Sequence, residues 1–166
     1  MTYRQINAFL VFICVVGSLF AVGYLQNTLG LDPCPLCIFQ RIGLWAMGLF
    51  ASLGLIFNPK GKGSRLTLWL GSLLGTLWGA GVAARHVWLQ HLPADEVPAC
   101  GPGLNYWVET LPIMQVFEQV LKGSGECALI DWTFLGLSIP MQTLILFVVI
   151  LVILLVQLTK ILKHRP

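Results

Sequence analysis

Long runs of apolar residues dominate the chain, and four of them are long enough to form membrane-spanning helices. A helix rises about 1.5 Å per residue, so crossing a hydrocarbon core about 30 Å thick takes roughly 20 residues. The pattern predicts an all-α membrane protein, a four-transmembrane-helix bundle that forms a single domain over 1–166. In the last run, Pro140 suits a first helical turn, which places the helix start near Ile139. The predicted spans lie at about 7–25, 38–57, 66–84 and 139–159.

Two of the connecting segments, at about 26–37 and 85–138, are predicted to be loops on the same side of the membrane. In the second loop, apolar residues recur at spacings of three and four between Leu104 and Leu121, which predicts a short amphipathic helix. Pro112 should kink or interrupt it. Such a segment either lies along the membrane surface or packs as a cap over the bundle.

Composition agrees with a lipid environment, because 57% of the residues are hydrophobic and only 10% are charged. Soluble domains carry about 25% charged residues. A net charge of +3 gives no reason to expect a nucleic-acid partner. The first apolar run exceeds the 7–15 residues usual for a signal peptide, so it is interpreted as a retained span.

The basic residues predict the orientation. All seven acidic residues fall in or beside the two predicted loops, whereas seven of the ten basic residues fall on the other side. Because lysine and arginine concentrate on the cytoplasmic side, both termini are expected in the cytoplasm. Those seven are Arg4, Lys60, Lys62, Arg65, Lys160, Lys163 and Arg165.

Small residues recur along the third span, where Gly71, Gly75 and Gly79 lie four residues apart. Glycine at this spacing lets helices approach closely in lipid. The pattern indicates a tightly packed bundle, and the alternative is a glycine-based homodimer face.

Four of the five cysteines fall on the loop side. Cys34 and Cys37 form a Cys-Pro-Leu-Cys motif at the mouth of the second span, and Cys100 and Cys127 bracket the amphipathic segment. Spacing favours pairing within each of these sets, although four cysteines allow three connectivities. A Cys-x-x-Cys pair usually serves redox chemistry or metal binding, whereas the second pair could be a structural staple. Cys14 lies alone in the first span and is expected to be inert.

The surroundings of Cys37 favour redox chemistry. Pro35 suits the first turn of a helix, which puts Cys34 near the N-cap and Cys37 among free backbone N–H groups that favour a thiolate. Arg41 lies four residues later on the same face, and a nearby guanidinium lowers the pKa of a thiol. The alternative for Arg41 is that it reaches toward lipid headgroups.

Zinc is the rival use of four cysteines, but the second pair is separated by 26 intervening residues and has no histidine beside it. The sequence therefore predicts no metal site.

Taken together, these segments resemble the disulfide bond formation protein B (DsbB) family over nearly the whole chain. The resemblance rests on motif order, on the arginine four residues after the second cysteine and on the second cysteine pair. The matching stretches are Asp32-Pro-Cys34-Pro-Leu-Cys37-Ile-Phe-Gln-Arg41, His86-Val-Trp-Leu-Gln90, Cys100, Leu111-Pro112, Val116-Phe117, Gly125-Glu-Cys127 and Trp132-Thr-Phe-Leu-Gly-Leu-Ser-Ile-Pro140.

The resemblance implies an enzyme of the bacterial inner membrane, a protein-dithiol:quinone oxidoreductase that sustains periplasmic disulfide formation. Its expected partners are a DsbA-like periplasmic thiol oxidant, the quinone pool (ubiquinone or menaquinone) and the lipid bilayer.

Each site residue receives a role from that resemblance. Cys100 matches the residue attacked by the partner thiolate, and Cys127 matches its disulfide partner. The resulting dithiol reduces the Cys34–Cys37 disulfide, and that pair reduces quinone. Cys37 matches the thiolate that contacts quinone and Arg41 the arginine beside its ring, while His86 either lines the same site or is only an interfacial residue.

Two other functions remain open at this point. A quinone reductase of the vitamin K epoxide reductase type shares the four-helix, Cys-x-x-Cys arrangement, but it usually carries the reactive motif late in the bundle. A non-enzymatic scaffold with structural disulfides or a metal site gives Arg41 no purpose beside Cys37.

Overall fold

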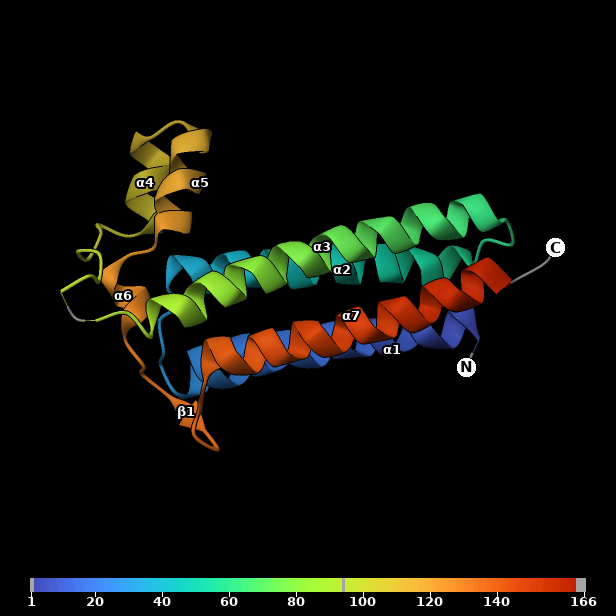
Figure 1. Ribbon diagram of the computed structural model, residues 1–166, viewed down its shortest axis with the longest axis horizontal. Helices are drawn as coiled ribbons and strands as arrows, with labels where there is room; N and C mark the ends of the chain where they lie inside the picture. The colour runs from blue at the N-terminus through green and yellow to red at the C-terminus, as the bar shows by residue number, and fades with distance from the viewer. Residues whose placement is uncertain (1, 94, 164–166) are drawn as a thin grey trace.

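Four long helices dominate the computed structural model, which describes residues 2–93 and 95–163 (Figure 1). Each is long and apolar enough to cross a membrane, so the predicted four-helix membrane bundle is confirmed. The last helix begins at Ile139, with Pro140 in its first turn as predicted. The spans are α1 (Tyr3–Ser18) continued by the π-helix η1 (Leu19–Thr28), α2 (Pro35–Phe57), α3 (Lys62–Leu89) and α7 (Ile139–Lys163).

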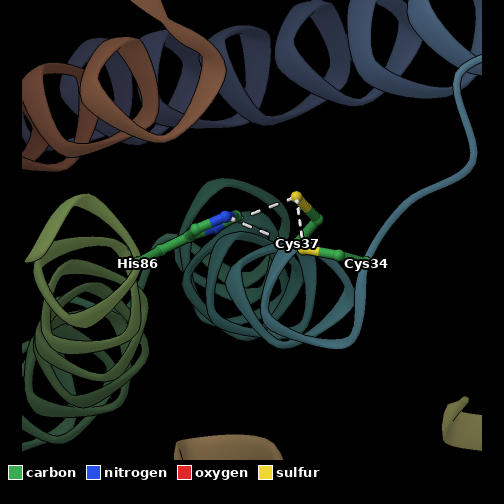
Figure 2. A group of neighbouring side chains, drawn as sticks. All are labelled: Cys34, Cys37 and His86. Atoms are coloured by element: carbon green, nitrogen blue, oxygen red, sulfur yellow. Dashed lines mark hydrogen bonds between the residues drawn. The ribbon is translucent and has the colours of Figure 1, made fainter. Parts of the chain in front are cut away.

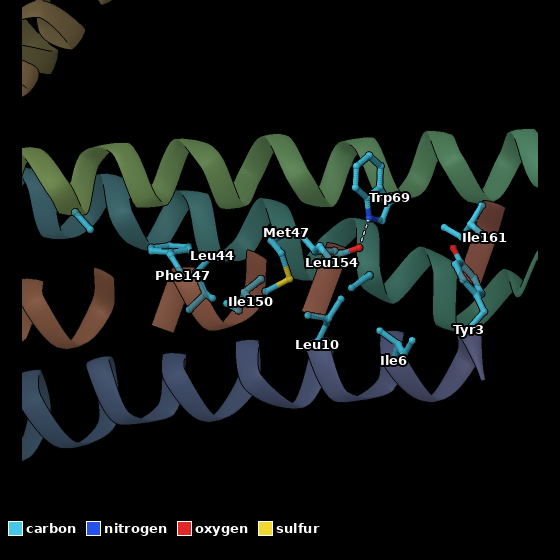
Figure 3. Packing of buried hydrophobic residues seen from close by; sticks show 12 residues of the cluster. Tyr3, Ile6, Leu10, Leu44, Met47, Trp69, Phe147, Ile150, Leu154 and Ile161 are labelled. Atoms are coloured by element: carbon cyan, nitrogen blue, oxygen red, sulfur yellow. Dashed lines mark hydrogen bonds between the residues drawn. The ribbon is translucent and has the colours of Figure 1, made fainter. Parts of the chain in front are cut away.

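The four helices close a ring, because α2 packs on α1 and α3, and α7 packs on both α1 and α3. Figure 3 shows the apolar core between them, where the Trp69 indole N–H donates to the Leu154 carbonyl at 2.8 Å. Large apolar side chains also cover the outside of the bundle, including Phe12 at 61% and Leu74 at 67% exposure. Exposed apolar surface on this scale fits contact with lipid, and the protein is a multi-pass membrane protein.

The polar ends of the bundle differ. The start of α1 and the end of α7 lie together at one end, and the long α3–α7 connection lies at the other (Figure 1). That connection contains α4 (Leu104–Thr110), α5 (Ile113–Lys122), α6 (Gly125–Ala128) and a two-stranded hairpin. The predicted loops therefore gather at the end opposite the termini. Arg165, which belongs to the predicted charge bias, lies outside the described residues.

The amphipathic segment of the long connection is interrupted at Pro112, as its sequence predicts, and forms the separate helices α4 and α5. One face packs on the bundle, with the Phe117 ring 5.3 Å from the Phe39 ring between centroids. The Arg85 guanidinium secures this arrangement by donating to the carbonyls of Leu121 and Lys122, at the end of α5. Met114 on the outer face is 76% exposed, so the segment both caps the bundle and presents apolar side chains outward.

A short β-hairpin just before α7 was not predicted. β1 (Thr133–Phe134) pairs antiparallel with β2 (Leu137–Ser138). Leu135 and Gly136 form the turn with φ of 53° and 77°, the left-handed pair that a two-residue hairpin requires. Gly136 is the residue that could have indicated a turn. Leucine rarely adopts a left-handed conformation, so Leu135 gave no sign of a hairpin.

The glycine pattern is used inside the bundle, where α2 and α3 approach closely. A Cβ at Gly43 would lie 2.8 Å from the Gly79 Cα, and one at Gly75 would lie 2.7 Å from the Met47 backbone nitrogen. The predicted tight packing of this span is thus an intramolecular helix contact.

Gly43→Ala is expected to destabilise the bundle by about 1–3 kcal/mol, the usual effect of overpacking a rigid contact. The obstructing atoms are backbone and cannot move as a side chain end can. Gly81→Ala is the matched control, because a Cβ there meets nothing within 4 Å. Thermal unfolding of both variants in detergent checks the expectation, and equal melting temperatures would contradict it.

Candidate active site

The Cys-Pro-Leu-Cys motif forms the N-terminus of α2. Cys34 is the N-cap residue, with extended backbone angles, and Pro35 occupies the first helical position. The backbone N–H of Ile38 donates to the Cys34 carbonyl at 3.2 Å, which closes the first turn around Cys37. The predicted local geometry is confirmed, and it leaves free backbone N–H groups beside the second thiol.

The two thiols of the motif lie side by side, and the Cys34 Sγ is 3.3 Å from the Cys37 Sγ. Both side chains are half-buried, and both are free thiols in this structure. Their proximity fits the predicted Cys34–Cys37 pair, with the structure describing its dithiol form.

His86, in the last turn of α3, contacts both thiols from the helix that neighbours α2 (Figure 2). Its Nε2 is 3.8 Å from the Cys34 Sγ, and its Nδ1 is 4.0 Å from the Cys37 Sγ. Its side chain is only 3% exposed. His86 thus lies at the cysteine pair instead of being an ordinary interfacial residue, the alternative that the sequence left open.

The hydrogen bonds of His86 fix its tautomer. Nε2 is 2.9 Å from the Cys127 carbonyl oxygen, which can only accept, so Nε2 carries the hydrogen. Nδ1 is 3.0 Å from the amide nitrogen of Gln40, which donates to it. In this arrangement Nδ1 accepts from Gln40 and lies 4.0 Å from the Cys37 Sγ. Gln40 is a site residue that sequence reasoning missed, although it stands within the quoted motif.

Cys127 is brought to the same place by α6. Its side chain is buried in a second apolar cluster that includes Leu36 and Val120, with Cys34 packed against it. Interaction with the Cys34 thiol and burial together raise the pKa of the Cys127 thiol well above its ordinary value. Cys127 therefore holds its proton in this dithiol state, in contact with the first thiol of the motif.

Cys100 differs from the other three site cysteines because it is exposed. Its segment packs on the start of α6, where the backbone N–H of Gly125 donates to the Ala99 carbonyl at 3.3 Å. A Cβ at Gly125 would lie 3.0 Å from the Cys100 Sγ, so the glycine permits this approach. The segments of Cys100 and Cys127 are thus adjacent, while the disulfide between them stays a prediction.

Arg41 reaches from α2 to the π-helix η1. Its guanidinium donates to the Gln26 side-chain oxygen at 2.9 Å and to the Ala21 carbonyl at 3.3 Å. Gln26 is a further residue that the sequence did not single out. Arg41 is held inside the protein by these bonds, which differs from an arginine that reaches for headgroups.

A cavity of about 320 Å³ opens at this level among the first, second and fourth spans and the end of the third. This volume lies within the range of about 300–1,000 Å³ usual for small-molecule sites. Most of the lining is apolar, and the polar groups converge where α2 begins. Its lining includes Cys34, Cys37, Arg41, His86, Phe20 and Leu146.

The folded chain also alters the argument about metals. No histidine lies beside either cysteine pair in the sequence. In the folded chain, however, potential ligand atoms lie within 4.8 Å of one another, one each from Cys34, Cys37 and His86. This set has the donor types that zinc prefers.

The fold and the site together define a class of multi-pass membrane protein. It has one pair of cysteines at the N-terminus of a spanning helix and two further cysteines in the long connection at the same end of the bundle. The family model described as disulfide bond formation protein DsbB matches residues 3–157. The chain belongs to the DsbB family, as the sequence resemblance predicts, and not to the vitamin K epoxide reductase type. Membership implies a disulfide-forming oxidoreductase.

Curated relatives agree over nearly the full length, and each is named disulfide bond formation protein B. One from Psychrobacter sp. (strain PRwf-1) is 59% identical over 165 residues, covering 99% of this chain and 96% of the relative. One from Psychrobacter cryohalolentis is 61% identical, covering 90% of this chain and 85% of the relative. One from Acinetobacter baumannii is 50% identical, covering 96% and 93%.

Proposed function

We propose that the protein reoxidises a DsbA-like periplasmic dithiol protein and passes the electrons to a membrane quinone. The observation that carries the proposal is the order of the sulfurs. Cys100 is exposed, Cys127 is buried against Cys34, and Cys37 lines a cavity together with Arg41. Thiol–disulfide exchange needs each sulfur to reach the next, and this order supplies that path.

The first exchange takes place at the exposed end. A partner thiolate attacks the Cys100 sulfur of a Cys100–Cys127 disulfide, forming a mixed disulfide and releasing Cys127 as a thiolate. The second thiol of the partner then attacks the mixed disulfide, so the partner leaves oxidised and the loop pair is left as a dithiol. Only Cys100 is exposed, which favours it as the attacked sulfur.

The second exchange transfers the two electrons inward. Cys127 loses its proton and attacks the Cys34 sulfur of a Cys34–Cys37 disulfide, and Cys37 departs as a thiolate. Cys100 then attacks Cys127, which restores the loop disulfide and releases Cys34. Cys37 is a favourable leaving group because it lies in the first turn of α2, where free N–H groups and the helix dipole stabilise negative charge.

Quinone is proposed as the final acceptor, and it takes up two electrons and two protons when it becomes quinol. Oxidation of the Cys34–Cys37 dithiol to a disulfide supplies both. The mostly apolar cavity has room for a quinone ring, and the Arg41 guanidinium can donate to a ring oxygen. His86 Nδ1, 4.0 Å from the Cys37 Sγ, would take up the Cys37 proton once the Gln40 amide stops donating to it.

An acceptor stronger than an ordinary disulfide is required by the energetics. DsbA is a strong oxidant, with a potential near −120 mV, so reoxidising it with an ordinary disulfide would be uphill. A lipid-soluble quinone meets this requirement and reaches the cavity through the bilayer.

The proposed location is the bacterial inner membrane, with the active cysteines in the periplasm. The start of α1 and the end of α7 lie at the same end of the bundle. Lys60 in the α2–α3 connection and Lys62 and Arg65 in the first turn of α3 belong to that end as well. This basic end favours the cytoplasm. The cysteines at the opposite end then lie in a compartment where disulfides persist.

Arg41→His is expected to raise the KM for quinone by about tenfold or more, the effect of losing a charged hydrogen bond worth about 1.5–3 kcal/mol. The KM for the protein dithiol should change much less. Steady-state kinetics with each substrate varied in turn measures the two constants. Arg65→His, at the opposite end of the bundle, is the control. Equal increases of both constants in Arg41→His would argue against a role on the quinone side.

A further inference from the structure

We propose that the dithiol state of this protein binds one zinc ion through Cys34, Cys37 and His86, with Cys127 as the fourth ligand. The site would be specific to the reduced protein, since a Cys34–Cys37 disulfide removes two of the four donors. Zinc would thereby hold the protein in its reduced form.

The separations of the donor atoms fit a single ion. Tetrahedral zinc with Zn–S near 2.3 Å and Zn–N near 2.0 Å places two sulfurs about 3.8 Å apart and sulfur and nitrogen about 3.6 Å apart. The Cys34 and Cys37 sulfurs are 3.3 Å apart, and the Cys37 Sγ is 4.0 Å from the His86 Nδ1. One ligand atom from each of the three residues lies within 4.8 Å of the others, so small side-chain movements would bring them around one centre (Figure 2).

The hydrogen bonding of His86 is also that of a metal ligand. A ligating histidine usually donates its second ring N–H to a carbonyl or carboxylate, which orients the ring. The His86 Nε2–H already donates to the Cys127 carbonyl at 2.9 Å. Nδ1 is then the ligand atom, and Gln40, whose flexible side chain now donates to it, must release it when the ion enters.

Cys127 is the proposed fourth ligand because it is buried in the cluster that Cys34 packs against. Its sulfur lies outside the set of three donor atoms within 4.8 Å of one another, so it must move toward them when the ion enters. Three thiols and one imidazole form a Cys₃His group, one of the common structural zinc sites. The ligands come from the start of α2, the end of α3 and α6, so binding would also tie the long connection to the bundle. Zinc binding displaces the thiol protons and changes no oxidation state.

The test measures metal binding to purified protein in detergent, without quinone or a protein partner. Reduced and oxidised protein are titrated anaerobically with Zn²⁺ against a chromophoric chelator. One zinc ion per reduced chain is expected, and none for the oxidised chain at the same free zinc. Co²⁺ in place of Zn²⁺ should give a thiolate-to-cobalt charge-transfer band. Equal binding to both redox states would overturn the proposal without requiring any variant.

Variants then identify the ligands. Cys37→Ser and His86→Ala should each weaken zinc binding by about a hundredfold or more, since even residues that only orient ligands contribute 10–100-fold. Cys100→Ser and His91→Ala, which change an exposed thiol and an exposed imidazole, should bind zinc as the parent does. Losses in these two controls as large as in His86→Ala would place the ion elsewhere and overturn the assignment.

Inhibition of turnover by zinc rests on the proposed function, whereas binding does not. In a turnover assay, zinc should stop quinone reduction and a chelator should restore it. A chain that binds zinc as described but never reduces quinone would refute the oxidase and leave the metal site standing. A chain that reduces quinone but binds no zinc would refute the metal site and leave the oxidase standing.

Discussion

Cys37→Ser and Cys34→Ser should each lower catalytic quinone reduction to the rate measured without protein. A serine oxygen cannot form the disulfide through which the electrons pass, so either substitution breaks the relay at its inner pair. The Cys34 and Cys37 thiols are 3.3 Å apart, and no other described thiol shares the cavity with them. Quinone absorbance during steady-state oxidation of a reduced donor measures the loss.

The same variants should still exchange once with the donor at the outer pair, because Cys100 and Cys127 are intact. One equivalent of donor is then oxidised per chain and the reaction stops. Cys14→Ser is the control. This thiol lies within the first two spans, where it donates to the Leu44 carbonyl, and its loss should leave full turnover. Multiple turnovers in either inner-pair variant would refute a relay through two pairs.

Cys127→Ser should stop the reaction one step earlier, with the donor trapped. Cys100 would then be unpaired. After mild oxidation with a donor whose second cysteine is replaced by Ser, it would form a mixed disulfide that neither the donor nor the outer pair can resolve. A stable covalent complex on a non-reducing gel, together with no quinone turnover, is the expected result.

Cys100→Ser is the matched comparison for that experiment. The remaining outer cysteine, Cys127, is 1% exposed, so a soluble partner should not reach it and no complex should form. Equal trapping in the two variants would mean that Cys100 is not the entry point.

The fold was largely predictable because lipid imposes simple rules on a sequence. Apolar length gave the four spans, and the proline rules located the start of α7 at Ile139 and the N-cap at Cys34. Less predictable were the polar contacts between spans, such as the Gln157 amide donating to Asn7 at 3.1 Å. Those two residues are 150 positions apart, and nothing in the local pattern of either one signals the contact.

The candidate site was only partly predictable, because some of its residues meet only through contacts between distant parts of the sequence. The cysteine motif and Arg41 are local in sequence, so spacing alone places them on one helix face. His86 and Cys127 reach Cys34 from different elements, and only the packing of α3 and α6 against α2 brings them together. The π-helix that receives the Arg41 hydrogen bonds has no periodicity distinct from an apolar α-helix, which is why Gln26 was missed.

The most direct test of the central claim is quinone reduction by the purified protein in detergent, with a reduced DsbA-like protein as the electron donor. Quinol formation and donor oxidation would be followed together, using ubiquinone and menaquinone in turn. The account predicts many turnovers, with one quinol formed for each donor disulfide and none when Cys37 is Ser. Absence of turnover with both quinones, in protein shown to be folded, would contradict it.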